Sequence, residues 1–205
     1  MISQFNMGLQ DEVSTMKELQ QKEEKLLMAA LHLFNEYGFH NTPTSRISKE
    51  AGVSTGTLYN YFESKEELIN SLYLFIKQHS VEYIMNGFKR TEDFKEGFNR
   101  IWTLMIQWGY ENPEFFKFKE SFCQSPFIEH LNKERINEQF GFLERYIRDA
   151  MENGIIREIE RELFLAVVQG IMVSTIKYIN KYKPEDCQTI IQNTFDLLWN
   201  GICNR

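Results

Sequence analysis

The segment from Asn41 to Leu68, NTPTSRISKEAGVSTGTLYNYFESKEEL, constrains the fold more strongly than any other part of this chain. It holds two short helical patterns, at about 43–51 and 54–62, joined by a tight turn at Gly52, which tolerates the positive φ that such a turn needs. The apolar residues that we expect to pack inward against a preceding helix are Ile47, Val53, Leu58 and Phe62. This arrangement predicts a helix-turn-helix.

Helical periodicity continues on both sides of this segment. An apolar stripe between Leu26 and Tyr37 predicts a first helix that begins at about Lys17 or Gln21, and Gly38 fits the left-handed position after its last turn. After the segment, the sequence Ser64-Lys65-Glu66-Glu67 is a capping box that opens a long helix ending near residue 87.

The rest of the chain also has the pattern of helices. We expect them at about residues 91–109, 113–123, 126–153, 160–181 and 184–202, with each proline in a first helical turn: Pro43, Pro113, Pro126 and Pro184. No stretch shows sustained alternation with period two, so the predicted fold class is all-α. We expect an N-terminal extension over 1–20, a helix-turn-helix domain over 21–70 whose fourth helix continues to about 89, and a C-terminal helical domain over 71–205.

Composition excludes several classes of function. The three cysteines form no CxxC motif and the four histidines are scattered, so we predict no metal, no cofactor and no catalytic residues. No apolar run approaches the roughly 18 residues of a membrane span, and the first twenty residues do not resemble a signal peptide, so we expect a cytoplasmic protein without a membrane partner. The net charge of −6 argues against nucleic acid, but residues 41–65 are about neutral.

The second short helix has an outer face that is poor core material. Small and hydroxyl-bearing residues gather at its N-terminal end, and tyrosines and a lysine follow: Ser54, Thr55, Gly56, Thr57, Tyr59, Tyr61 and Lys65. Small residues let a helix enter the major groove of DNA, and hydroxyl groups can bond phosphate oxygens. Any one of these features is more often a cap or a packing residue, but together with the spacing of helix, turn, helix and capping box they favour DNA binding.

The sequence AGVSTGTLYNYFESKEEL resembles the signature of the TetR family of transcription regulators, and EEKLLMAALHLFNEYGFHNTPTSRIS resembles the family's first two helices. The resemblance covers about residues 21–70. It implies an N-terminal three-helix DNA-binding domain, a C-terminal bundle for ligand binding and dimerisation, and a non-enzymatic repressor that a small, largely apolar effector releases from a palindromic double-stranded operator. The DNA-binding residues that it implies are Thr44, Ser45, Ser54, Thr55, Gly56, Thr57, Tyr59, Tyr61 and Lys65. Ser45 departs from members that carry a long basic residue there.

The C-terminal half is crowded with aromatic residues between 94 and 142. Each ring taken alone is more often core, but their excess also fits an apolar effector cavity. The residues that we expect in its wall are Trp102, Met105, Phe116 and Phe122. The resemblance implies a homodimer whose interface is built from the last two helices of each protomer, and there we expect Val167, Gly170, Ile171, Ser174, Phe195 and Leu198.

Three other classes of function compete with this hypothesis. An enzyme is disfavoured because the sequence shows no catalytic triad, paired carboxylates or glycine-rich phosphate loop. A helical adaptor without DNA binding is disfavoured by the outer face described above. A thiol-based redox regulator remains an alternative, because Cys123 lies near Lys117 and Lys119 in sequence, and nearby cations favour a thiolate.

Overall fold

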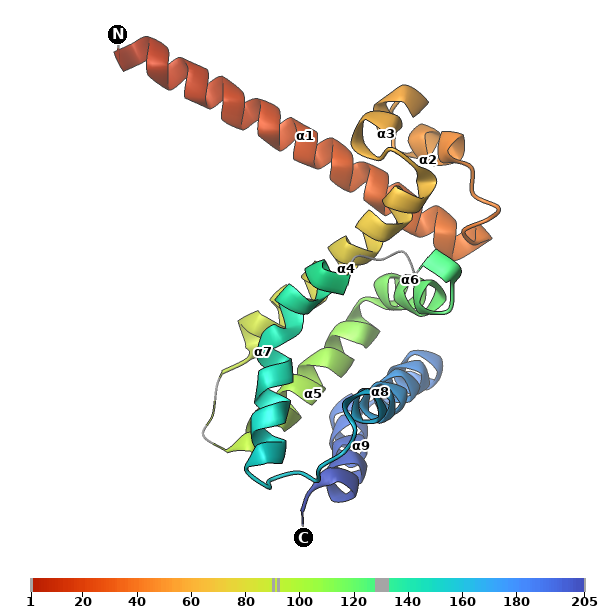
Figure 1. The fold of residues 1–205 in the computed structure, drawn as a ribbon. Helices are drawn as coiled ribbons and strands as arrows, with labels where there is room; N and C mark the ends of the chain where they lie inside the picture. Colours follow the sequence, from red (N-terminus) through yellow and green to blue (C-terminus); the bar gives the residue numbers. More distant parts are fainter. Residues whose placement is uncertain (1, 90, 92, 128–132, 205) are drawn as a thin grey trace. The chain divides into compact units, whose positions relative to one another are not determined.

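The computed structural model describes residues 2–89, 91, 93–127 and 133–204, together with their side chains except those of 2–18 and 133–142. All regular elements in these parts are helices, which confirms the predicted all-α class: α1 (Ile2–Tyr37), α2 (Thr44–Glu50), α3 (Thr55–Tyr61), α4 (Lys65–Gly87), α5 (Phe94–Glu111), α6 (Pro113–Cys123), α7 (Lys133–Glu152), α8 (Arg161–Tyr182) and α9 (Cys187–Ile202) (Figure 1). They form two compact units. The N-terminal unit is Met1–Phe75 with Lys117–Leu131, and the C-terminal unit is Ile76–Phe116 with Asn132–Arg205.

The core of the N-terminal unit forms where α1, α2, α3 and the first turns of α4 meet. Its fully buried side chains include Leu26, Leu33, Ile47, Leu58, Phe62, Leu68 and Leu72. Of the four inward residues predicted from the sequence, Ile47, Leu58 and Phe62 are buried and Val53 is half-buried. The loop after α1 is held by Thr42, whose buried hydroxyl group lies within hydrogen-bonding distance of the carbonyl oxygens of Leu33 and Gly38.

The end of α6 belongs to the N-terminal unit. The ring of Phe118 contacts the rings of Phe34 and Phe39, with centroids 6.3 and 5.6 Å away. The ring of Phe122 stacks on Tyr73 of α4, with the centroids 4.2 Å apart. Phe122 therefore packs with the helix-turn-helix unit.

The core of the C-terminal unit gathers side chains of α5, α8 and α9, together with residues of α7. It includes Phe98, Trp102, Ile106, Phe164, Ile176, Phe195 and Leu198. The indole Nε1 of Trp102 donates a hydrogen bond to the carbonyl oxygen of Ile191, at 3.2 Å. Gly109 lets α5 approach α8 closely, because a Cβ there would lie 2.5 Å from Cδ1 of Ile176.

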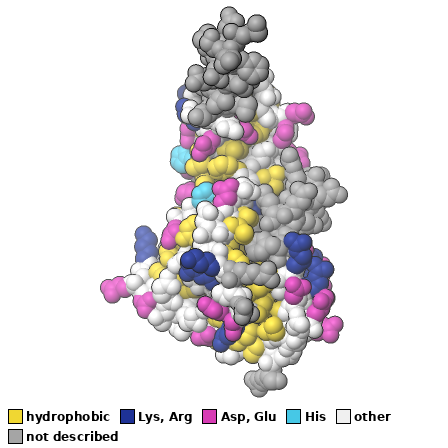
Figure 2. Space-filling model, turned by 90° about the vertical axis from the view of Figure 1, so that its left-hand side faces the viewer, with side chains coloured by type: hydrophobic (Ala, Val, Ile, Leu, Met, Phe, Trp, Pro, Cys, Tyr) yellow, Lys and Arg dark blue, Asp and Glu magenta, His cyan; other side chains and the backbone are white. Residues whose placement is uncertain are grey.

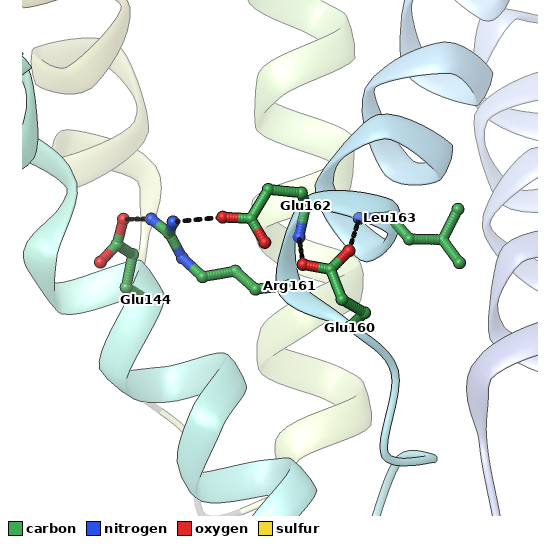
Figure 3. Close-up of polar contacts among 5 residues, drawn as sticks. All are labelled: Glu144, Glu160, Arg161, Glu162 and Leu163. Atoms are coloured by element: carbon green, nitrogen blue, oxygen red, sulfur yellow. Dashed lines mark hydrogen bonds and ion pairs between the residues drawn. The ribbon is translucent and has the colours of Figure 1, made fainter.

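The start of α8 is fixed by charged side chains (Figure 3). Glu160 caps the helix, since its carboxylate accepts the backbone N–H groups of Glu162 and Leu163 at 3.1 and 2.8 Å. The guanidinium group of Arg161 pairs with the carboxylates of Glu144 on α7 and of Glu162. These contacts tie the first turn of α8 to α7.

Several helix boundaries differ from those predicted. α1 begins at Ile2 rather than near residue 17 or 21, so residues 2–20 belong to the same helix. Pro43 is the N-cap of α2, and Pro184 lies ahead of the N-cap of α9, which is Asp186. Of the helix expected over 126–153, the structure describes α7 from Lys133 onward, and residues 128–132 lie outside the described part; the hydroxyl group of Ser125 donates back to the carbonyl oxygen of Phe122 at the end of α6.

Candidate nucleic-acid interface

The turn between α2 and α3 has the geometry that the sequence predicts. Gly52 has φ +71°, and Ser54 caps α3 by accepting the backbone N–H of Thr57 at 3.0 Å. Gly56 is exposed, and a Cβ built on it would come near only Oγ of Ser54, at 3.7 Å. The first turn of α3 therefore presents an open, unobstructed backbone.

The start of α4 has the predicted Ser64 cap, while the returning bond of the capping box goes to the residue before the cap. The hydroxyl group of Ser64 accepts the backbone N–H of Glu67 at 3.0 Å, and the carboxylate of Glu67 accepts the backbone N–H of Glu63. Lys65, in the first turn, is half-buried, and this burial lowers the pKa of its ammonium group from the ordinary value.

Hydroxyl groups on α2 and α3 meet in pairs. Oγ1 of Thr44 lies 3.1 Å from Oη of Tyr59, and Oγ of Ser48 lies 3.0 Å from Oγ1 of Thr55. Within α3, Oγ of Ser54 and Oγ1 of Thr57 are 2.8 Å apart. Most residues predicted to contact DNA thus meet across the α2–α3 contact or at the start of α3.

Three further side chains lie on or beside this surface. Ser45 is exposed on α2, whereas Tyr61 is half-buried and its hydroxyl oxygen is buried without a hydrogen-bond partner among the described residues. The structure therefore does not present the Tyr61 hydroxyl to a phosphate. Sequence reasoning did not select Arg46, which is exposed and has its guanidinium carbon 3.8 Å from the centroid of the Tyr37 ring. That contact joins α2 to α1 and has no local sequence signal.

Basic side chains form no continuous patch on the face shown in Figure 2, where Lys and Arg are interspersed with Asp and Glu. This mixture agrees with the net charge of −6.

The four residues expected to line an effector cavity belong to both compact units. Trp102 and Phe116 are buried in the core cluster of the C-terminal unit, and Met105 packs against that cluster. Phe122 belongs to the N-terminal unit, where it stacks on Tyr73. Each of the three aromatic rings is buried in the packed core of its own unit.

The outer face of α8 and α9 agrees in part with the predicted dimer interface. Gly170 and Ser174 are exposed, Val167 is 45% exposed, and Ile171 is half-buried. The prediction that Phe195 and Leu198 lie at the interface was wrong, because both side chains are buried in the core of their own chain and are at most 2% exposed. The large apolar side chains that are exposed on these helices are Leu163, Leu165, Val167, Tyr178, Tyr182 and Leu197.

An open groove of about 500 Å³ lies on α8 and α9 and is lined partly by Gly170, Ser174, Tyr178, Ile190, Asn193 and Thr194. α8 is also long and apolar enough to cross a membrane by length and composition, and 28% of that window is buried within the chain. This result reflects mean hydropathy over 18 residues and not an unbroken apolar run, and a single such helix is weak evidence for a membrane span, because the core helix of a soluble protein passes the same test. A helix with such an exposed apolar face in a globular chain marks an interaction surface.

Comparisons with known proteins agree with this architecture. Residues 26–72 match the profile described as bacterial regulatory proteins, tetR family, and residues 73–204 match the profile described as tetracyclin repressor-like, C-terminal domain. A solved TetR-family transcription regulator from Shewanella sp. PV-4 superposes with a TM-score of 0.83 at 30% identity, over 90% of this chain and 99% of the other.

Named relatives are similar over most of their length. The fatty acid metabolism regulator protein of Bacillus subtilis is 23% identical over 93% of this chain and all of the relative. A nucleoid occlusion factor from Glaesserella parasuis is 28% identical over 69% of this chain and 70% of the relative. The structure of a fatty acid metabolism regulator from Clostridium perfringens has a TM-score of 0.72 at 24% identity, over 88% of this chain and all of the other.

Proposed function

This chain belongs to the TetR family of bacterial regulatory proteins, and on that premise we propose that it is a repressor whose homodimer binds a palindromic operator and is released by a small apolar effector. Members of the family are DNA-binding transcription regulators rather than enzymes. The observation that carries the proposal is the exposed start of α3, where Gly56 and the Ser54–Thr57 pair leave the helix backbone open to a duplex.

A palindromic operator follows from the symmetry of a two-fold dimer. Two copies of α3 related by the dimer axis enter successive major grooves about 34–36 Å apart, and each reads one half-site. The cytoplasm, where chromosomal DNA lies in bacteria, is the compartment in which we propose that the protein acts.

Dimerisation through α8 and α9 is supported by the apolar side chains that these helices leave exposed. Leu163, Val167 and Leu197 are 56%, 45% and 72% exposed in the single chain. Small residues at 170 and 174 let a second pair of helices approach closely. We propose that this face is covered by the same face of a second copy, which removes the apolar surface from water.

The effector class that we propose is long-chain fatty acids. The support is that a relative from Bacillus subtilis and solved structures from Clostridium perfringens and Bacillus halodurans are named regulators of fatty acid metabolism or degradation. The aromatic composition of the C-terminal unit is compatible with an acyl chain. The cavity itself is not assigned to particular residues.

Transcription in vitro from the region upstream of the chain's own gene tests repression and release together. We expect transcript to fall when the protein is added and to recover with palmitate, while hexanoate, with a much shorter apolar chain, has little effect. Unchanged transcript with protein would contradict the repressor proposal at this promoter. Repression that palmitate does not relieve would contradict the effector class alone.

A further inference from the structure

Ser48 lies at the centre of the contact between α2 and α3, although nothing in the sequence pattern separates it from an ordinary polar helix residue. It is 1% exposed, and its hydroxyl group touches both a backbone group of α2 and a side chain of α3. A buried polar group with bonds to two elements specifies their relative position more narrowly than apolar packing does.

Counting protons fixes the direction of each bond. A serine or threonine hydroxyl group carries one proton and two lone pairs. The Ser48 hydroxyl donates its proton to the carbonyl oxygen of Ser45, at 3.1 Å. In the bond to Thr55, at 3.0 Å, the Ser48 oxygen must therefore accept, and Thr55 must donate.

This assignment limits what Thr55 can do at a DNA surface. While the bond to Ser48 is kept, the Thr55 proton is not available to a phosphate oxygen or to the acceptor atoms of guanine and thymine, although its oxygen can still accept a hydrogen bond. The pair formed by Thr44 and Tyr59 differs, because the two hydroxyl groups share one bond at 3.1 Å and retain one further proton. Tyr59 is 46% exposed, so that pair is open to a partner.

We infer that Ser48 and Thr55 are a positioning pair that sets the recognition helix α3 against α2, and that the hydroxyl group of Thr55 serves operator binding through its bond to Ser48 and not as a donor to DNA. The inference rests on the proposed operator binding. Their effect on DNA binding comes from the bond between them, which fixes the position of α3 relative to α2. Without this bond α3 can adopt more positions, so affinity for the preferred operator falls more than affinity for a random duplex.

A double-mutant cycle on operator binding tests this inference. The operator is first obtained by selection from random duplexes with the wild-type protein, so a failure at that step would speak against the proposed function and not against the pair. Binding of this operator and of a random duplex is then measured for Ser48→Ala, Thr55→Val and the double variant. We expect each of the three to lose roughly 3- to 10-fold of the operator-over-random ratio, with the double variant no worse than either single variant.

Two further variants make the outcome specific. Thr55→Ser keeps the hydroxyl group and is expected to bind like wild type. Thr57→Val removes a hydroxyl group two residues away, and its effect is expected to add to that of Ser48→Ala. Thermal unfolding checks that each variant is folded. A larger loss for Thr55→Val than for Ser48→Ala, additive losses, no loss, or failure of Thr55→Ser to bind would each overturn the inference.

Discussion

Lys65 is the cation among the predicted DNA-contacting residues, and its position differs from that of a free surface lysine. It lies in the first turn of α4, half-buried, and burial lowers the pKa of its ammonium group. A single well-placed cation of this kind matters more in a chain with a net charge of −6 than in a basic protein.

Replacement of Lys65 by alanine is expected to weaken DNA binding without changing its specificity. A phosphate contact carries no base information, so affinity should fall by about the same factor on operator and random duplex. The slope of log affinity against log salt should decrease by roughly one unit for each phosphate that the variant no longer neutralises. Fluorescence anisotropy titrations at several salt concentrations measure both quantities. A selective loss on the operator would show that Lys65 contributes to sequence recognition instead.

At the residue scale, Trp102 also tests whether an aromatic ring of the C-terminal unit is a core residue or part of a cavity wall. Its side chain is 1% exposed and its indole nitrogen is hydrogen-bonded to α9. Trp102→Ala should therefore cost about 3–5 kcal/mol of unfolding free energy, measured by urea denaturation. Trp199→Ala serves as a control with a smaller expected loss, because Trp199 is only half-buried. Near-unchanged stability in Trp102→Ala would indicate a loosely packed wall of a cavity.

At the scale of elements, α8 combines two faces with different tasks. One face carries Phe164, Met172 and Ile176 into the core, and another exposes Leu163 and Val167. A helix that packs only within its own chain would not keep these apolar side chains in water. The second face is therefore best explained by association, and it leaves room for a partner, because the space beside the glycine at position 170 is open.

Gly170→Glu is expected to split the dimer while leaving the protomer folded. A Cβ at this position would meet no neighbouring heavy atom within 4 Å in the single chain, so the carboxylate is solvated there, but in the dimer it would be buried without a partner. Gln169→Glu introduces the same group at an exposed neighbour turned by about 100° around the helix. Sedimentation should give a monomer for the first variant and a dimer for the second. A dimeric Gly170→Glu protein would place the interface elsewhere.

Local signals predicted the N-terminal elements well because their determinants are local. Gly52, the Ser54 cap and the Ser64 cap each act within a few residues, and the structure contains all three. The assignment of rings in the C-terminal half depended on which helix faces meet, and sequence spacing does not contain that information. Phe195 and Leu198 fit an apolar interface stripe as well as a core stripe, and only the packing of α9 on α5 and α8 assigns them to the core.

The same limit applies within the helix-turn-helix itself. The pattern identified Thr55 as a DNA contact because it lies at the start of the recognition helix. Its bond to Ser48 depends on the crossing of α2 and α3 and becomes visible only in three dimensions. Arg46 behaves in the same way, since its stacking on Tyr37 joins residues of two helices.

At the scale of the whole molecule, the central claim is that two copies of one helix-turn-helix act together on symmetric DNA. Each half of the claim depends on the other. One short recognition helix contacts few bases, and a dimer without an exposed recognition helix has no means of reading sequence. The total negative charge makes non-specific binding weak, so the specific contacts must provide most of the difference between operator and other DNA.

Selection from a pool of random duplexes at about 50 mM salt tests this claim most directly, because low salt preserves the phosphate contacts. The account predicts that the wild-type protein enriches a palindrome whose half-site centres are about 10 base pairs, or a multiple of that, apart. The monomeric Gly170→Glu variant should not enrich the full palindrome under the same conditions. If the folded, dimeric wild-type protein enriches no palindrome, the repressor account is contradicted and a helical adaptor without DNA binding takes its place.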